Sequence, residues 1–100
     1  MQNISVNVNS NHECTFLFGG DLTIDLVQEL TALVNKHKNE DSFILDFSNV
    51  KFFDSSGIGA IIEMREVVKD GYNAIRFINV SDQLKQKFEK FQITGMFQIS

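Results

Sequence analysis

The apolar run at residues 43–47 (FILDF) constrains the fold of this chain more than any other stretch. It has the length of a strand, and its nearly continuous apolar character is typical of a central strand covered on both faces. Residues 24–36, just before it, place apolar side chains at helical spacing, and an apolar strand pattern precedes them. Strand, helix and buried strand in this order predict a βαβ unit, a right-handed crossover and a partly parallel sheet.

The rest of the chain supplies strands and helices in alternation. Residues 4–8 alternate apolar and polar side chains, and a second apolar run at 14–18 completes an antiparallel hairpin. Residues 58–70 and 82–91 have the periodicity of two further helices, with Ser81 as N-cap of the second, and strands are expected at 74–78 and 96–99. The predicted class is α/β with α+β character: a small mixed sheet in the order β-β-α-β-α-β-α-(β), with helices packed mainly on one face.

Composition excludes several classes of partner and compartment. A chain of 100 residues buries one core, and its net charge of -4 argues against a nucleic-acid surface. No apolar run approaches the roughly 20 residues that span a bilayer, and residues 1–4 lack the features of a signal peptide. The single cysteine, Cys14, lies in an apolar run and is expected to pack as a small hydrophobe. We therefore expect a cytoplasmic protein without membrane insertion that acts on a protein partner.

The stretch at residues 52–59 (FFDSSGIG) changes abruptly from strand-like to small and polar, and then becomes an amphipathic helix. Asp54, Ser55 and Ser56 are residue types that cap helices, because their side-chain oxygens accept hydrogen bonds from free N–H groups of the first turn. A helix N-terminus also favours a phosphate or carboxylate, and glycines permit close backbone approach. The spacing alone is consistent both with a purely structural cap and with a site at which Ser56 receives charge.

Catalytic and metal-binding alternatives lack the residues that they need. A nucleophile elbow around Ser56 requires glycines where the chain has Asp54 and Ile58, and no histidine follows His37. One cysteine and two distant histidines give no metal-ligand spacing. The motif lacks the third glycine of a dinucleotide fingerprint, and the chain has no Walker-type loop. The sequence therefore predicts a protein that is not an enzyme and has no metal or cofactor of its own.

Residues 53–59 (FDSSGIG), preceded by 44–47 (ILDF), resemble the signature of STAS domains of the anti-sigma factor antagonist family. The segments 20–22 (GDL) and 91–97 (FQITGMF) also resemble the pattern of that family in order and spacing. The resemblance extends over nearly the whole chain. It implies the STAS fold, with residues 1–100 forming a single STAS domain.

The resemblance implies a role in bacterial transcriptional regulation by partner switching. In the family, the second serine of the Asp-Ser-Ser-Gly segment is phosphorylated by a partner that is both serine kinase and anti-sigma factor. Here that serine is Ser56, with Ser55 as the secondary candidate. The unphosphorylated form binds the anti-sigma factor and frees the sigma factor, phosphorylation ends binding, and a serine phosphatase restores it. We expect the free protein to be a monomer.

The residues around Ser56 are expected to form the partner surface. Gly57 would allow close approach of the partner's nucleotide site, whose ATP contacts the loop, and Asp54 is expected to be a cap that fixes the loop rather than a catalytic base. Phe52 and Phe53 are expected to belong to the core. The predicted surface is completed by Ser55, Ile58, Gly59, Asp21 and Thr23.

The chain departs from the family pattern at two places. Thr23 stands where the family often has an acidic residue, and the chain ends at Ser100 where many relatives continue into another helix. The alternative function is a non-phosphorylated STAS scaffold subunit, either of a phospholipid-transport type transporter or of a stress-signalling complex. Transporter subunits commonly replace one serine of the pair, so the intact Ser55 and Ser56 favour the switch over that role. Stress-signalling components keep a phosphoacceptor but usually have an added N-terminal domain.

Overall fold

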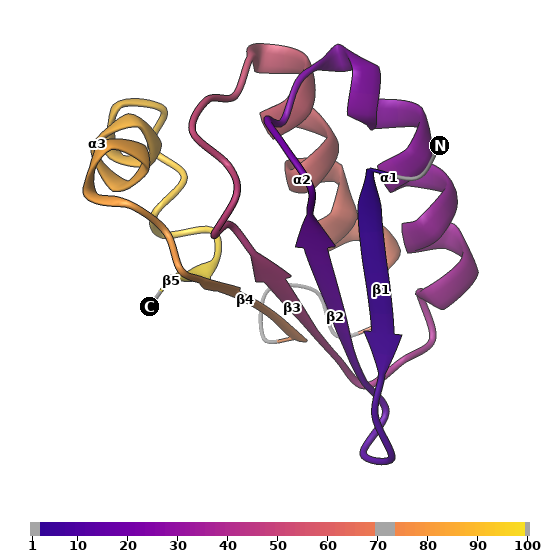
Figure 1. Ribbon diagram of the computed structural model, residues 1–100. Helices are drawn as coiled ribbons and strands as arrows, with labels where there is room; N and C mark the ends of the chain where they lie inside the picture. The colour runs from indigo at the N-terminus through magenta and orange to yellow at the C-terminus, as the bar shows by residue number, and fades with distance from the viewer. Residues whose placement is uncertain (1–2, 70–73, 100) are drawn as a thin grey trace.

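The computed structural model describes residues 3–69 and 74–99, which form a five-stranded mixed sheet and three helices (Figure 1). The strands lie in the order β1-β2-β3-β4-β5, with β1 antiparallel to β2 and every later neighbour parallel. This arrangement confirms the predicted hairpin, the parallel pairing and the order of elements. Along the chain the elements are β1 (Ile4–Val8), β2 (Glu13–Phe18), α1 (Ile24–His37), β3 (Ser42–Asp46), α2 (Ser55–Val67), β4 (Ile75–Ile78), α3 (Asp82–Lys90) and β5 (Gln98–Ile99).

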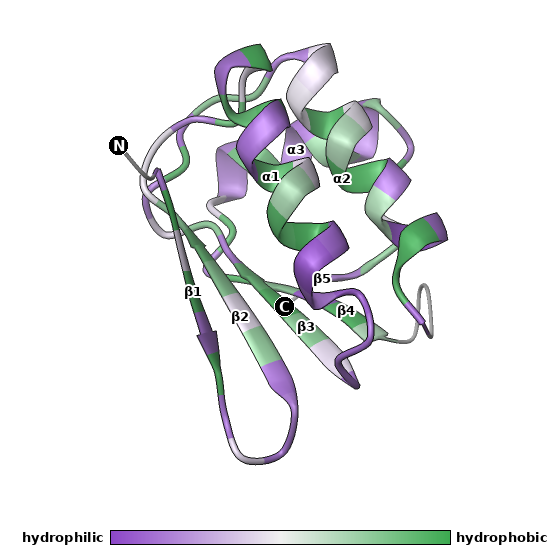
Figure 2. Cartoon of the chain, turned by 90° about the vertical axis from the view of Figure 1, so that its right-hand side faces the viewer, coloured by the Kyte–Doolittle hydropathy of each residue, from purple (hydrophilic) through white to green (hydrophobic). Residues whose placement is uncertain are grey.

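The sheet buries one face under helices and leaves the other open. Along β2 buried and half-buried side chains alternate, and Phe16 is on the buried side. The ring of His37 in α1 lies edge-on to Phe16, with centroids 6.4 Å apart, and Phe88 of α3 lies 5.7 Å from Phe77 of β4. Figure 2 shows α2 beside α1 over the same face. The described helices therefore cover a single face, as predicted.

The prediction that β3 is covered on both faces is wrong. Phe43 and Leu45 face the helices, whereas Ile44 points to the open side. Ile44 is nevertheless only 9% exposed, because it lies between Thr15 of β2 and Arg76 of β4 in the sheet register. The continuous apolar run thus reflects shielding by neighbouring strands and not a second layer of helices.

A cluster of phenylalanine rings joins the sheet to α3. Phe47, Phe77 and Phe88 are each at most 1% exposed, and their ring centroids lie 4.8–5.8 Å apart. Pairs at such distances add about 0.5–1.5 kcal/mol each to the free energy of burial. Phe88 also stacks on Phe53, with centroids 5.2 Å apart. The core therefore extends without interruption to the stretch at residues 52–59.

Several element ends differ from the predicted ones. Helix α2 ends at Val67, before the expected end near residue 70, which lies outside the described residues. Helix α3 begins after Ser81, whose side chain accepts a hydrogen bond from Leu84 N and so confirms the predicted cap. Helix α3 ends at Lys90, one residue before the expected end, and its C-cap residue Phe91 is 53% exposed. Within the described ranges, no helix has both the length and the apolar character needed to cross a membrane.

Cys14 is fully buried in β2, as predicted, and this burial, reinforced by the charge of Glu40, raises the pKa of its thiol from 9.0 to about 11. Because the thiolate is the reactive form, we expect the native protein to resist a thiol-specific maleimide at about pH 8. The folded state binds this proton more tightly than the unfolded state, so the associated stability is present below pH 9 and is lost between about pH 9 and 11. The expectation would be contradicted if the folded protein were labelled as fast as protein unfolded in urea.

Candidate functional site

Two loops lie side by side at one end of the sheet. The first loop, residues 19–23, joins β2 to α1, and the second loop, residues 47–54, joins β3 to α2. Because β2 and β3 are adjacent parallel strands, both loops leave the same edge (Figure 1). Leu22 N donates to Phe52 O and Asp54 N donates to Leu22 O, each with a donor–acceptor distance of 3.0 Å. These two bonds form an isolated parallel bridge between Leu22 and Phe53 that ties the loops together.

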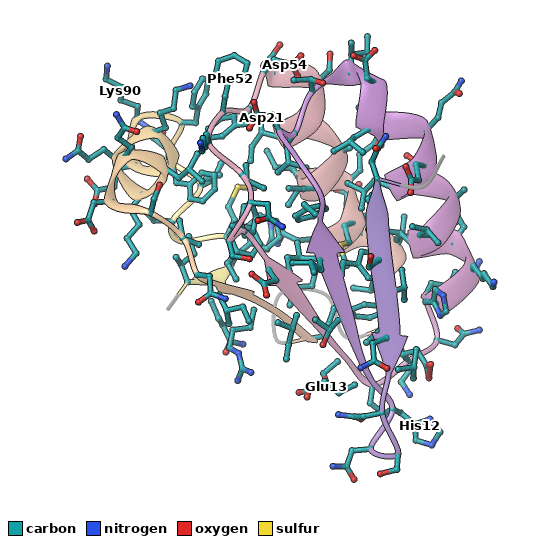
Figure 3. All side chains as sticks on the ribbon, viewed as in Figure 1. His12, Glu13, Asp21, Phe52, Asp54 and Lys90 are labelled. Carbon is teal, nitrogen blue, oxygen red and sulfur yellow. The ribbon has the colours of Figure 1, made fainter. Side chains whose placement is uncertain are left out.

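Asp21 holds the second loop from the first. Its Oδ1 accepts hydrogen bonds from Lys51 N at 2.9 Å and from Phe52 N at 3.1 Å. Figure 3 shows Asp21, Phe52 and Asp54 gathered at this end of the molecule. Asp21 was expected on the partner surface; the structure gives its carboxylate a role within the fold.

Asp54 caps two helices. Its Oδ1 accepts from Gly57 N at 2.8 Å, which makes Asp54 the N-cap of α2 and confirms the predicted structural role. Its Oδ2 accepts from Ile24 N, the first residue of α1, at 3.2 Å. Thr23 occupies the N-cap position of α1, but its side chain makes no capping hydrogen bond. The second loop therefore supplies the cap that the first loop lacks.

Gly57 is required inside the fold. A Cβ atom at this position would overlap the Leu22 carbonyl group and lie 2.6 Å from its carbon. The close approach that Gly57 permits is thus the approach of α2 to the first loop, and a role in admitting a partner's nucleotide stays a prediction. Gly59, by contrast, has open space where a Cβ would be built.

Ser55 and Ser56 lie exposed in the first turn of α2. Among the described residues, no side chain or backbone group is hydrogen-bonded to either hydroxyl. The first turn itself contains no acidic residue, but the Asp54 carboxylate caps Gly57 N and places a negative charge at this helix end. Both hydroxyls are free to react, and a phosphate on either would lie at the N-terminus of α2 beside that carboxylate. The geometry does not distinguish Ser55 from Ser56.

Apolar side chains beside the serines differ from the prediction. Phe53 is 3% exposed, as expected, but Phe52 is 47% exposed, and the assignment of Phe52 to the core is wrong. Successive residues of this extended segment point to opposite sides, so only one of the two rings can face the core. Ile58, expected on the partner surface, is buried in the core, and that expectation is also wrong. Ile24, at the start of α1, is 65% exposed and was not predicted as a surface residue.

The carboxylate of Asp46, at the end of β3, is also engaged within the fold. It accepts hydrogen bonds from Ser48 N and Asn79 Nδ2, each at 3.0 Å. Burial alone would raise the pKa of Asp46, but these hydrogen bonds outweigh burial and lower it. Across residues 3–69 and 74–99, no group of three or more His, Cys, Asp or Glu side chains could hold a metal ion.

The model of the STAS domain family matches residues 3–100, and the chain therefore belongs to the STAS family. A comparison with curated proteins gives no match.

Solved structures of STAS proteins share this fold. The anti-sigma factor antagonist SpoIIAA in its unphosphorylated form is 18% identical with a TM-score of 0.70, covering 97% of this chain and 86% of its own. The phosphorylated form of SpoIIAA, from Bacillus, is 16% identical with a TM-score of 0.67, and the match covers 97% of this chain and 90% of SpoIIAA. An anti-sigma factor antagonist from Mycobacterium paratuberculosis is 14% identical with a TM-score of 0.78, and the match covers 96% of this chain and 82% of the antagonist.

The likeness extends to a protein of another kind. A sulfate transporter family protein from Wolinella succinogenes is 18% identical with a TM-score of 0.74, covering 93% of this chain and 79% of its own. At these identities the neighbours establish the STAS fold and do not separate one function from another.

The two glycines of α2 give a matched test of the loop contact. Gly57→Ala should lower the free energy of unfolding by about 1–3 kcal/mol or more, because its methyl group must displace the Leu22 carbonyl. Gly59→Ala meets no atom and should raise stability by about 0.5–1 kcal/mol through higher helix propensity. Urea unfolding of both variants measures the difference. Equal effects at the two positions would show that α2 is not in contact with the first loop at Gly57.

The double cap predicts a graded response at Asp54. Asp54→Ala leaves Gly57 N and Ile24 N without their acceptor and should cost about 1–3 kcal/mol of unfolding free energy. Asp54→Asn keeps only one acceptor oxygen and should cost less than Asp54→Ala. Hydrogen exchange at the amides of Gly57 and Ile24 reports each cap separately. Unchanged exchange at Ile24 in Asp54→Ala would remove the assignment of Asp54 to α1.

Proposed function

We propose that the chain acts as a single STAS domain with the function of an anti-sigma factor antagonist. Its unphosphorylated form binds an anti-sigma factor with serine kinase activity and so frees a sigma factor, and phosphorylation of Ser56 ends that binding. A serine phosphatase restores the binding form. The observation that carries the proposal is the exposed Ser56 hydroxyl in the first turn of α2, which makes no hydrogen bond within the described structure. The loop before this helix is held by the Asp54 cap and does not depend on the serine.

A phosphate on Ser56 would change the surface and leave the fold in place. It adds roughly 1.5–2 negative charges in the first turn of α2, where the helix dipole attracts them and the capping carboxylate of Asp54 repels them. The bonds that hold the loop use Asp21, Asp54 and backbone groups of residues 22 and 52, and none of them uses the Ser56 side chain. A partner surface complementary to a neutral hydroxyl would then face a dianion and lose affinity.

Two lines support this function over a purely structural role for the serines. The resemblance of residues 53–59 to the antagonist signature assigns the acceptor to the second serine, Ser56. SpoIIAA, an anti-sigma factor antagonist with structures in an unphosphorylated and a phosphorylated form, has the same fold. In this proposal the chain supplies no catalysis, binds no nucleic acid and receives the phosphate from the ATP of its partner.

A second candidate function is a STAS scaffold that is not phosphorylated, in a transporter or stress-signalling complex. The fold shared with the sulfate transporter family protein supports this alternative. In that case the exposed Ser56 would be a surface residue without consequence for binding.

Serine variants separate the two functions. Affinity capture from lysate of the source cell, followed by addition of ATP, should release the kinase partner from wild type and Ser55→Ala but not from Ser56→Ala. Ser56→Asp should capture roughly tenfold less partner, since an added charge at the interface costs binding, while its melting temperature stays close to wild type. Mass spectrometry identifies the partner and the phosphorylated residue. Retention of the same transporter proteins by all four forms would favour the scaffold.

A further inference from the structure

A basic pocket lies beside the second loop. It is open to the surface, has a volume of about 310 Å³, and brings together a loop residue and one face of α3: Lys51, Gln83, Gln86, Lys87 and Lys90. Its lining contains three lysines and no carboxylate. Figure 3 shows Lys90 on α3 and Phe52 on the second loop at this side of the molecule.

The three lysines give the pocket a positive charge on a protein whose net charge is negative. The chain has 13 acidic residues against 9 lysines and arginines, yet the acidic residues of α3, Asp82 and Glu89, do not line the pocket. Within the described ranges, the ion pairs are His12 with Glu40 and Lys69 with Asp41, and none involves a lysine of the pocket. The helix dipole favours a basic last turn in α3, but it does not account for the third lysine, Lys51, which comes from the second loop.

Aromatic rings flank these charges. The Lys87 ammonium lies 4.3 Å from the centroid of the Phe52 ring and 5.0 Å from that of Phe53, a geometry that holds a half-buried lysine in place. The Phe91 ring lies 5.6 Å from Phe53. Phe52 and Phe91 are about half exposed, so apolar surface continues from the pocket onto both neighbouring elements.

We propose that this basic and aromatic surface is the docking site for an acidic segment of a protein partner. The ammonium groups of Lys51, Lys87 and Lys90 match carboxylates, the amides of the two glutamines can bond an extended backbone, and the exposed rings accept an apolar side chain. A phosphate ligand fits less well, because the pocket has no arginine to bind its oxygens in a bidentate way.

The docking site adjoins the second loop, which leads into the serines of α2. Lys51 and Phe52 donate their backbone N–H groups to Asp21, and Phe52 accepts from Leu22, so the pocket and the first turn of α2 are built on the same pair of loops. One partner can therefore cover both. The identity of that partner rests on the proposed function, whereas the charge chemistry of the pocket does not use Ser56.

A peptide that alternates glutamate and leucine provides the probe, with a glutamine and leucine peptide as its neutral control. Fluorescence anisotropy measures affinity, and amide chemical shifts locate the bound peptide. We expect shifts at residues 51–53 and 83–91, and salt near 0.5 M should weaken binding by screening. Lys87→Glu/Lys90→Glu should weaken binding roughly tenfold or more. Lys36→Glu/Lys38→Glu makes the same change of charge at the end of α1 and should leave binding unchanged.

Three results would overturn the docking site: no peptide shifts at these residues, equal weakening by both lysine pairs, or displacement of the peptide by low concentrations of pyrophosphate or by phosphatidylglycerol vesicles. Lys87→Gln/Lys90→Gln, checked for thermal unfolding, replaces the glutamate variant if that variant is not folded. Ser56→Asp should bind the peptide like wild type. If ATP-dependent release at Ser56 fails while the peptide binds, the proposed function falls and the docking site stands.

Discussion

The pairing of the two loops after β2 and β3 is the constraint on which the rest of this end of the molecule depends. Two backbone hydrogen bonds bring the loops together. Asp21 of the first loop accepts from two backbone N–H groups of the second loop, and Asp54 of the second loop accepts from the backbone N–H of Ile24 at the start of α1. Gly57 allows this pairing, because any larger residue would push α2 away from the Leu22 carbonyl. The starts of α1 and α2 are therefore set by one shared arrangement and cannot shift independently.

This arrangement separates the parts that hold the loop from the part that is offered to solvent. The carboxylates of Asp21 and Asp54 are occupied by N–H groups, whereas the Ser56 side chain has no bond to the rest of the described structure. Charge added at Ser56 thus acts on whatever binds the surface and not on the loop itself. Such a separation suits the proposed switch, in which a partner reads the added charge while the bonds that hold the loop stay in place.

The sequence predicts the features that depend on local pattern and fails where distant segments meet. The cap at Ser81 follows from its position before an apolar helix, and the cap of α2 by Asp54 follows in the same way. The cap of α1 by Asp54 crosses 30 residues of sequence, and no local spacing indicates it. The same limit explains Phe52 and Phe53. The sequence does not show which of two adjacent rings points inward, and in the folded chain the extended segment directs only Phe53 towards Phe88 in the core.

The exposed Phe52 connects the two halves of the surface. Its backbone belongs to the paired loops, through Asp21 and Leu22, and its ring lies under the Lys87 ammonium of α3. A core position for this ring would have left Lys87 with only the more distant ring of Phe53 as its aromatic contact. Because the ring points outward instead, the second loop, which leads into α2, meets the lysines of α3 at the surface of an otherwise acidic protein. In the proposed docking, an acidic partner segment is attracted by the lysines of the pocket, and a phosphate on Ser56 would change the charge beside the second loop without changing the contacts of α3.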